Sequence, residues 1–335
     1  GFSSLSFYVA SLYLLSFPTR RSSDLRHYIP AGFAAGAPLV VVLHGCTQNA
    51  AGYDHGSGWS ALADRHGFAL LYPEQRPANN PNRCFNWFAA DDITRYQGEA
   101  LSIRQMIAHM IAEYHIDPTR VFVNGLSAGG AMTMVMLATY PEVFAGGAVI
   151  AGLPYGTATS VGAALQRMRG SGLPDGPALA ELVREAAPTP LRWPRLSVWH
   201  GTDDQTVAND NMEAIIAQWA LLQGIPLDAA KRDQVDGQAR RRWLSSRGTV
   251  RIEAYSIAGL GHGTPIDPVG DAACGTVMPF MLPAGTCSTR HIAASWGIAD
   301  AADIEVPSRR STPPPPLRAA ARPIAPVGVA KAISD

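Results

Sequence analysis

The sequence predicts an α/β fold in which helices cover both faces of a mostly parallel central sheet. Short runs of aliphatic and β-branched residues alternate with longer segments whose apolar residues recur every three or four positions. The run LVVVLHG is apolar almost throughout and ends at glycine, as is typical of a strand buried on both faces. Strands that alternate with helices indicate parallel pairing, with ligands bound beyond the carboxyl ends of the strands.

Six runs are predicted to form the strands of this sheet. The first is LVVVLHG at residues 39–45, which glycine ends. The others follow in order: GFALLYPE (67–74), RVFVNG (120–125), GGAVIAG (146–152), RLSVWHG (195–201) and TVRIEAYSI (249–257).

Helices are predicted in the segments between these strands. The clearest lies before residue 120, because apolar side chains recur there at helical spacing: Ile103, Met106, Ile107, Met110, Ile111 and Tyr114. Further helices are predicted at 59–66, 127–140 and 211–222. Residues 155–193 form a loop-rich insertion with short helical patterns, which is interpreted either as a cap over the site or as a packing excursion.

Length and composition indicate one large globular domain. The chain has 335 residues, of which 47% are hydrophobic and 16% charged, enough for a substantial core. Its 27 acidic and 27 basic residues balance, so no overall field favours nucleic acid or an anionic membrane as a partner. The sequence indicates no particular oligomeric state.

The two ends of the chain depart from the α/β pattern. Near the start, Arg20 and Arg21 follow an apolar run instead of preceding it, which is the wrong order for an export signal. The stretch SFPTRRSSDL resembles a translated sequencing adapter, so residues 1–25 are interpreted as a non-native leader that replaces the true start. The globular domain is predicted at residues 26–300, and residues 301–335 are predicted to be a proline-rich disordered tail.

The four cysteines favour disulfides over a metal site. Cys46, Cys84, Cys274 and Cys287 show neither CxxC spacing nor another common metal-ligand pattern. Two disulfides are predicted, with Cys46–Cys84 and Cys274–Cys287 as one of three possible connectivities. Disulfides would indicate an oxidising compartment.

One serine has the sequence context of a catalytic nucleophile. Gly125, Leu126, Ser127, Ala128 and Gly129 fit the G-x-S-x-G elbow, with a predicted strand before it and a predicted helix after it. Glycine is needed on both sides because the strained turn brings neighbouring backbones close together. Ser127 is therefore the predicted nucleophile, and the alternative is a simple tight turn.

A serine nucleophile needs a base and an orienting acid, which follow it along the chain in this architecture. His262 lies in a glycine-rich loop just after a predicted strand, whereas His200 and His291 are interpreted as structural. The acid is expected after the strand at 195–201, where Asp203 and Asp204 are adjacent and spacing does not separate them. The aspartate that is not the acid is expected to cap the helix that begins near residue 207.

Acyl transfer also needs two donors to the oxyanion. The expected pair is the amide of Ala128, just after the nucleophile, and the amide of Cys46 in the loop LHGCTQN. His44 of the same loop precedes the serine and is interpreted as structural rather than as the base. This chemistry needs neither a metal nor an organic cofactor.

These motifs together resemble esterases of the polyhydroxybutyrate depolymerase family, which are α/β-hydrolases related to feruloyl and acetylxylan esterases. The resemblance spans residues 26–297 and rests on five segments in family order: LHGCTQNAAGYDHGSGWSALADRHGFALLYPEQ, RCFNWF, VFVNGLSAGGAMT, VWHGTDDQTV and GLGHGTPID. It implies the α/β-hydrolase fold, with Ser127 as nucleophile and His262 as base. It also implies Asp204 as the acid, at the fifth position of H-G-x-x-D-x-x-V.

The resemblance carries further implications for the pocket and the compartment. It implies that Cys46 pairs with Cys84 and that the protein is secreted or periplasmic. Trp87 and Phe88 are then expected at the edge of the acyl pocket, with core aromatics as the alternative interpretation. Tyr155 is expected on the opposite wall.

The expected function is ester hydrolysis of short-chain hydroxyalkanoate esters and oligomers. Crystalline polymer is disfavoured, because no polymer-binding module follows the proline-rich segment. The alternatives are a feruloyl or acetylxylan esterase, a prolyl-oligopeptidase-like peptidase and a non-catalytic binding relative. The peptidase is disfavoured because propeller repeats are absent, and the non-catalytic relative because all three triad candidates are present.

Overall fold

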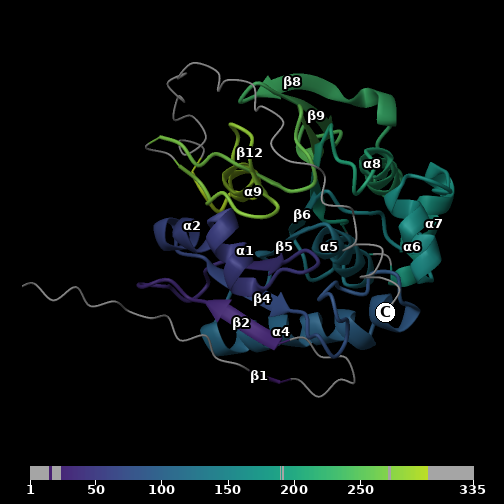
Figure 1. The fold of residues 1–335 in the computed structure, drawn as a ribbon. Helices are drawn as coiled ribbons and strands as arrows, with labels where there is room; N and C mark the ends of the chain where they lie inside the picture. The colour runs from purple at the N-terminus through teal and green to yellow at the C-terminus, as the bar shows by residue number, and fades with distance from the viewer. Residues whose placement is uncertain (1–14, 17–23, 189, 191, 271–272, 301–335) are drawn as a thin grey trace, which may run out of the picture.

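The computed structural model describes residues 15–16, 24–188, 190, 192–270 and 273–300 (Figure 1). The predicted tail at 301–335 lies outside the described residues, as does most of the predicted leader. The described chain forms a ten-stranded sheet with helices on both faces, which confirms the predicted fold class. No helix of the described part has both the length and the apolar character needed to cross a membrane.

The centre of the sheet is parallel, and its edges are antiparallel. Six neighbouring strands run in parallel: β4 (Ala69–Glu74), β3 (Leu39–Leu43), β5 (Val121–Leu126), β6 (Gly146–Ile150), β7 (Arg195–Gly201) and β10 (Val250–Ile257). At one edge β2 (Asp24–Tyr28) pairs antiparallel with β4 and with β1 (Leu15–Ser16). At the other edge β9 (Gln238–Leu244) and β8 (Lys231–Val235) continue antiparallel from β10.

The six predicted strands are the six parallel strands, and the antiparallel edges were not predicted. Strand β2 starts at Asp24, where Asp24 pairs with Glu74 and Leu25 with Pro73, so these two residues belong to the sheet although they were expected in the leader. Strands β8 and β9 are rich in charged residues and largely half-buried or exposed. A search for apolar runs therefore passes over them.

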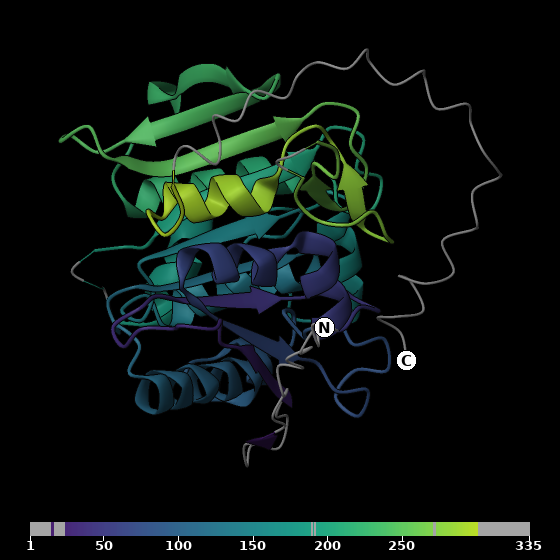
Figure 2. The ribbon, with the colours of Figure 1, turned by 90° about the vertical axis from the view of Figure 1, so that its left-hand side faces the viewer.

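Two helical layers enclose the sheet (Figure 2). Helices α4 (Gly98–Tyr114), α5 (Ala128–Thr139), α7 (Gly176–Ala186) and α8 (Asp210–Leu222) contribute to the core on one face. Helices α1 (Ala50–Ser57), α2 (Trp59–His66) and α9 (Ser288–Ser295) contribute to the core on the other. The remaining short elements are α3 (Ala90–Ile93), α6 (Val161–Met168), a 3₁₀ turn (Leu227–Ala229), β11 (Thr264–Ile266) and β12 (Met281–Pro283).

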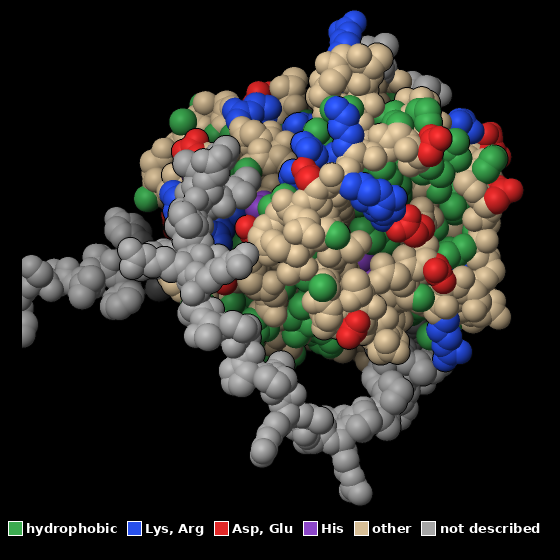
Figure 3. All heavy atoms as spheres, turned by 90° about the horizontal axis from the view of Figure 1, so that it is seen from above, with side chains coloured by type: hydrophobic (Ala, Val, Ile, Leu, Met, Phe, Trp, Pro, Cys, Tyr) green, Lys and Arg blue, Asp and Glu red, His purple; other side chains and the backbone are tan. Residues whose placement is uncertain are grey.

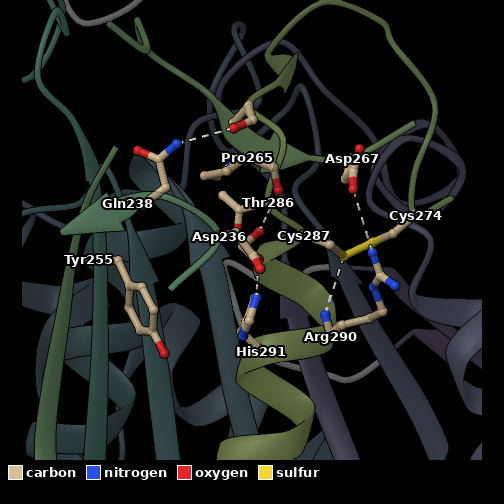
Figure 4. A network of polar contacts seen from close by, with 12 residues as sticks. Asp236, Gln238, Tyr255, Pro265, Asp267, Cys274, Thr286, Cys287, Arg290 and His291 are labelled. Atoms are coloured by element: carbon tan, nitrogen blue, oxygen red, sulfur yellow. Dashed lines mark hydrogen bonds and ion pairs between the residues drawn. A yellow bond between two sulfur atoms is a disulfide. The ribbon is translucent and has the colours of Figure 1, made fainter. Parts of the chain in front are cut away.

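Covalent and polar contacts hold the segment that follows β10 (Figure 4). A disulfide joins Cys274 to Cys287 at the start of α9. The carboxylate of Asp236, in the turn between β8 and β9, accepts hydrogen bonds from Thr286 Oγ1 at 2.9 Å and from His291 Nε2 at 2.6 Å. These contacts tie α9 to the edge hairpin and so limit the movement of the loops beyond β10.

Candidate active site

Ser127 lies at a strained corner between β5 and α5. Its φ of 57° and ψ of −119° lie outside the usual regions for a residue with a side chain. A Cβ added at Gly125 would lie 2.4 Å from the Gly129 backbone, and one at Gly129 would lie 2.2 Å from Leu43 O. Only glycine fits at both positions, so the elbow packs tightly against the end of β3.

Asp204 lies just beyond the carboxyl end of β7 and is buried. Its Oδ1 accepts hydrogen bonds from the amides of Thr206 at 2.8 Å and Val207 at 2.9 Å. Its Oδ2 lies 2.7 Å from His262 Nδ1. This fixed geometry leaves the carboxylate little freedom to turn away from the imidazole.

Asp203 points elsewhere and does not cap a helix. Its Oδ1 accepts a hydrogen bond from Thr202 Oγ1 at 3.1 Å. Helix α8 begins at Asp210 with Asn209 as its N-cap, so the expected cap near residue 207 is wrong. The turn at 204–207 is instead closed by the side chain of Asp204 itself.

His200 supports Asp204 from within the core. The fully buried His200 Nε2 donates to Val207 O at 2.8 Å and lies 3.4 Å from Asp204 Oδ2. Burial alone would raise the pKa of Asp204, but hydrogen bonds from His200 and His262 outweigh it and hold that pKa well below its ordinary value. Asp204 is therefore ionised across the neutral range.

His262 follows β10 in the loop predicted to hold the base. Because Asp204 is acceptor-only when ionised, His262 Nδ1 carries the proton and donates it to Oδ2. His262 Nε2 is then the free basic nitrogen. His262 and Ser127 line the same cavity. The hydroxyl of Ser127 makes no capping hydrogen bond to α5, so that hydroxyl can turn toward the imidazole.

The two amides expected to hold the oxyanion belong to the same cavity. Ala128 is the first residue of α5, and its amide lies at the positive end of the helix dipole. Cys46 lies across the cavity and is joined to Cys84 by a disulfide, with a Cα–Cα distance of 4.2 Å. The disulfide ties the loop after β3 to the loop that carries Trp87.

His44 fixes the peptide unit that bears the Cys46 amide. Its Nδ1 donates to Gly45 O at 2.8 Å, and its Nε2 accepts from the amide of Gln75 at 3.1 Å. Burial lowers the pKa of His44 and keeps the ring neutral, as this pattern requires. Since a trans peptide is planar with C=O and N–H opposed, fixing the Gly45 carbonyl also directs the Cys46 N–H. These contacts favour a structural role for His44 beside the amide that is expected to hold the oxyanion.

The cavity is small and mostly apolar, with a volume of about 170 Å³. Trp87 and Phe88 form one wall, where their rings meet edge to face at 5.5 Å. Tyr155 is not among the described residues that line this cavity, and its hydroxyl donates to Ile93 O at 3.2 Å, so its place on the opposite wall stays a prediction. Leu153 and Met168 are further apolar residues that line the cavity.

Several lining residues were not predicted from the sequence. Met168, at the end of α6, shows that part of the 155–193 insertion reaches the cavity. Phe280 lies beside the base, with its ring centroid 6.3 Å from that of His262. Neither residue stands in a recognisable motif. Gln48 also lines the cavity and belongs to the loop LHGCTQN, but no role was predicted for it. Its Oε1 accepts a hydrogen bond from the Gly45 amide at 2.8 Å.

Comparisons with known proteins find esterases among the relatives of this chain. A family model described as "Esterase PHB depolymerase" matches residues 24–242. The poly(3-hydroxyalkanoate) depolymerase C of Paucimonas lemoignei is 47% identical over 278 residues, which cover 81% of this chain and 66% of that protein. The chain thus spans about two thirds of the length of this relative.

More distant relatives include feruloyl and acetylxylan esterases. The feruloyl esterase B of Talaromyces stipitatus is 30% identical over 72% of this chain and 68% of its own length. Among solved structures, an acetyl xylan esterase from Aspergillus awamori superposes with a TM-score of 0.72 at 23% identity, covering 86% of this chain and all of that one. This likeness shows a shared α/β-hydrolase fold.

Proposed function

The chain belongs to the esterase PHB depolymerase family, and from this membership we propose that it is a serine carboxylic-ester hydrolase for short-chain hydroxyalkanoate esters and oligomers. The observation that carries the proposal is the 2.7 Å contact between His262 Nδ1 and Asp204 Oδ2, with Ser127 on the same cavity. A buried acid, an oriented imidazole and a partly exposed hydroxyl at an elbow are the three parts expected of a serine hydrolase triad.

In the first half of the reaction, Ser127 Oγ attacks the ester carbonyl carbon while His262 Nε2 takes the hydroxyl proton. Asp204 stays ionised and stabilises the imidazolium. The amides of Ala128 and Cys46 donate to the oxyanion, each lowering the barrier by about 3 kcal/mol. Collapse of the tetrahedral intermediate breaks the ester C–O bond, and the departing alcohol receives the proton from His262.

In the second half, water replaces the alcohol. His262 Nε2 removes a proton from the water as it attacks the acyl-enzyme carbonyl, and the same amides hold the new oxyanion. The bond to Ser127 then breaks, Ser127 regains its proton from His262, and the carboxylic acid leaves. These reaction steps involve no change of oxidation state, and apart from the ester and water they use only groups of this chain.

The cavity supports a short acyl group. Its volume of about 170 Å³ and its apolar walls of Trp87, Phe88 and Leu153 accommodate a few carbon atoms out of water. Feruloyl and acetylxylan esters remain the alternative substrates within the same reaction class. Disulfides form and persist in oxidising compartments, so the two disulfides support a secreted or periplasmic location, which we propose.

The test is hydrolysis of p-nitrophenyl acetate, butyrate and octanoate by the wild type and by Ser127→Ala. We expect turnover of the two shorter esters to exceed that of octanoate and to be lost in Ser127→Ala, with exposed Ser171→Ala as the matched control. Hydroxybutyrate oligomers, feruloyl esters, acetylated xylan and a proline peptide then separate the substrate classes. Ester turnover that survives in Ser127→Ala would contradict the mechanism, and turnover of the peptide alone would contradict the substrate class.

A further inference from the structure

The cavity beside Ser127 holds almost no charge of its own. None of the described residues that line it is an aspartate, glutamate, lysine or arginine. Charged side chains lie on the outside instead: Figure 3 looks down on the side where β8 lies uppermost in Figure 1, and it shows Lys and Arg interspersed with Asp and Glu. Apart from His262, an oxyanion that forms at Ser127 therefore depends on neutral hydrogen-bond donors close by.

One side chain of this lining is an amide without an assigned role. Gln48 ends the turn at residues 45–48, which its backbone amide closes by donating to Gly45 O at 3.3 Å. Its side chain folds back over the same turn, where Oε1 accepts a hydrogen bond from Gly45 N at 2.8 Å. The side-chain amide of Gln48 is therefore held in one place at the edge of the cavity.

This side-chain amide lies beside the nucleophile elbow. A Cβ added at Gly45 would lie 2.9 Å from Gln48 Oε1 and 3.5 Å from the carbonyl oxygen of Leu126, the residue before Ser127. Glycine at position 45 thus leaves room for the Gln48 side chain next to the elbow. The amide of Cys46, which is expected to hold the oxyanion, belongs to the same turn. Gln48 and this expected donor therefore approach Ser127 from one short segment.

The hydrogen bond from Gly45 also fixes which way round the Gln48 amide lies. A backbone N–H donates, so the atom that meets it is the oxygen, and the NH₂ group lies at the other end of the planar amide. No described residue accepts a hydrogen bond from Gln48 Nε2, and Nε2 is not among the buried atoms that lack a partner. Nε2 is therefore accessible, with its N–H groups available to a bound substrate.

A third donor has a specific use when an ester carbonyl becomes an oxyanion. The carbonyl oxygen of the substrate has two lone pairs, which the amides of Ala128 and Cys46 can meet, whereas the tetrahedral oxyanion has three. A donor that meets the third lone pair acts more strongly on the transition state than on the substrate, so it raises kcat without lowering KM. The hydrogen bond that Gln48 Oε1 accepts also polarises the amide and strengthens Nε2–H as a donor.

We propose that Gln48 is a catalytic residue whose Nε2–H donates a third hydrogen bond to the oxyanion, beside the amides of Ala128 and Cys46. This role rests on the ester hydrolysis proposed above. Two contacts prepare it: Gly45 N holds the side chain, and the Cys46–Cys84 disulfide ties down the turn. Because the donor is fixed before the substrate arrives, little reorganisation accompanies the reaction.

Gln48→Glu and Asn49→Asp make the same amide-to-carboxylate change at adjacent residues. Gln48→Glu keeps the oxygen that holds Gly45 N and removes the Nε2 donor, whereas Asn49→Asp keeps the oxygen that caps α1 at Gly52 N. We expect Gln48→Glu to lower kcat for p-nitrophenyl butyrate about 10²-fold at the plateau of the pH profile, with KM little changed. Exposed Asn49→Asp is the matched control and should keep the kcat of the wild type.

A short-chain trifluoromethyl ketone tests the contact itself. Ser127 Oγ adds to the ketone carbon, His262 takes the hydroxyl proton, and the ketone oxygen becomes a stable oxyanion. We expect the inhibition constant to rise about 10²-fold in Gln48→Glu. A crystal structure of the wild-type adduct should place Gln48 Nε2 about 2.7–3.1 Å from the oxyanion. This measurement needs no variant, so it decides the role even if circular dichroism shows that Gln48→Glu fails to fold.

Three results would overturn this role: a fall in kcat for Gln48→Glu no larger than that for Asn49→Asp, an unchanged inhibition constant, or an adduct in which Nε2 lies beyond hydrogen-bond distance of the oxyanion. Gln48→Ala removes both the donor and the oxygen that holds Gly45, so a loss of kcat in Gln48→Ala but not in Gln48→Glu would mean that Gln48 only supports the turn. None of these results bears on ester hydrolysis itself, which fails only if the wild type shows no turnover that Ser127→Ala abolishes.

Discussion

Two adjacent aspartates differ completely in their surroundings. Asp204 is buried, accepts hydrogen bonds from two backbone amides on one oxygen and contacts His262 with the other, whereas the Asp203 side chain accepts a hydrogen bond from Thr202 Oγ1. Spacing along the sequence could not separate them, because neighbouring residues after a strand point in different directions that depend on the turn. Family resemblance selected Asp204, and its contact with His262 supports our proposal that it is the acid.

Replacing Asp204 by asparagine should lower kcat by a factor on the order of 10⁴. The amide would favour the wrong imidazole tautomer and would no longer stabilise the imidazolium. Hydrolysis of p-nitrophenyl butyrate measures the effect, with Asp203→Asn as the matched control of the same size and charge change. If the two variants were equally impaired, the assignment of the acid to Asp204 would be incorrect.

The pKa of Asp204 also sets a direction for stability. Because it is held below its ordinary value, the ionised carboxylate stabilises the fold above the ordinary aspartate pKa near 4, and this contribution disappears as pH falls through the folded value. Neutral and alkaline solutions therefore keep both the acid and the hydrogen bonds that it accepts.

Among the elements, the loop after β3 combines several restraints on one amide. The Cys46–Cys84 disulfide ties this loop to the loop that carries Trp87. The side chain of His44 donates a hydrogen bond to the Gly45 carbonyl, and the side chain of Gln48 accepts one from the Gly45 amide. The strand that precedes this loop was readable from its continuous apolar run. The restraints were not, because His44 and Gln48 act through contacts whose partners the local pattern does not reveal.

Removing the Cys46–Cys84 disulfide should cost more stability than removing the Cys274–Cys287 disulfide. The first encloses a sequence separation of 38 residues and the second one of 13. Chain entropy gives about 3.9 and about 2.9 kcal/mol for loops of these lengths. Denaturant unfolding of the two double Cys→Ala variants compares them directly, and an equal or reversed order would contradict the loop-length argument.

The same two variants should differ in catalysis. Loss of Cys46–Cys84 frees the loop that carries the proposed oxyanion donor, so kcat should fall although the proposed triad is intact. Loss of Cys274–Cys287 loosens the segment before α9 and leaves that donor in place. Steady-state kinetics on p-nitrophenyl butyrate separate these effects, and equal kcat values in the two variants would contradict the role of the loop.

At the scale of the whole molecule, the parallel centre of the sheet was predictable and the antiparallel edges were not. Central strands such as β5 are buried along their full length, so burial alone shapes their composition. Edge strands such as β9 follow no apolar run, and their place depends on pairing with β10. For the same reason the motif residues of the candidate site were predicted, whereas Met168 and Phe280, brought in by distant segments, were missed.

Glu99 connects several parts of the fold near the active site. It lies in the first turn of α4 and is fully buried, where its carboxylate accepts hydrogen bonds from Gln75 Nε2, Asn86 N and Asn86 Nδ2. The backbone amide of Gln75 in turn donates a hydrogen bond to His44 Nε2, and Asn86 precedes Trp87, which lines the cavity. The hydrogen bonds favour the ionised form, but burial and the nearby charge of Asp92 outweigh them and raise the pKa of Glu99 to about 8.

This raised pKa predicts that the fold loses stability as the pH rises from about 4.3 toward about 8. Below the ordinary glutamate pKa of about 4.3 both states hold the proton, and above it only the folded state does, until pH passes about 8. The contribution of Glu99 is therefore fully present at low pH and falls by up to about 1.4 kcal/mol per pH unit as pH rises toward the folded value.

Glu99→Gln cannot titrate, so its unfolding free energy should decline less than that of the wild type between about pH 6 and about pH 9. Urea unfolding across this range measures the slope, with exposed Glu181→Gln as the control for loss of an ordinary carboxylate. Parallel slopes for the wild type and Glu99→Gln would mean that Glu99 is ionised throughout, in which case its three donors outweigh burial and Asp92.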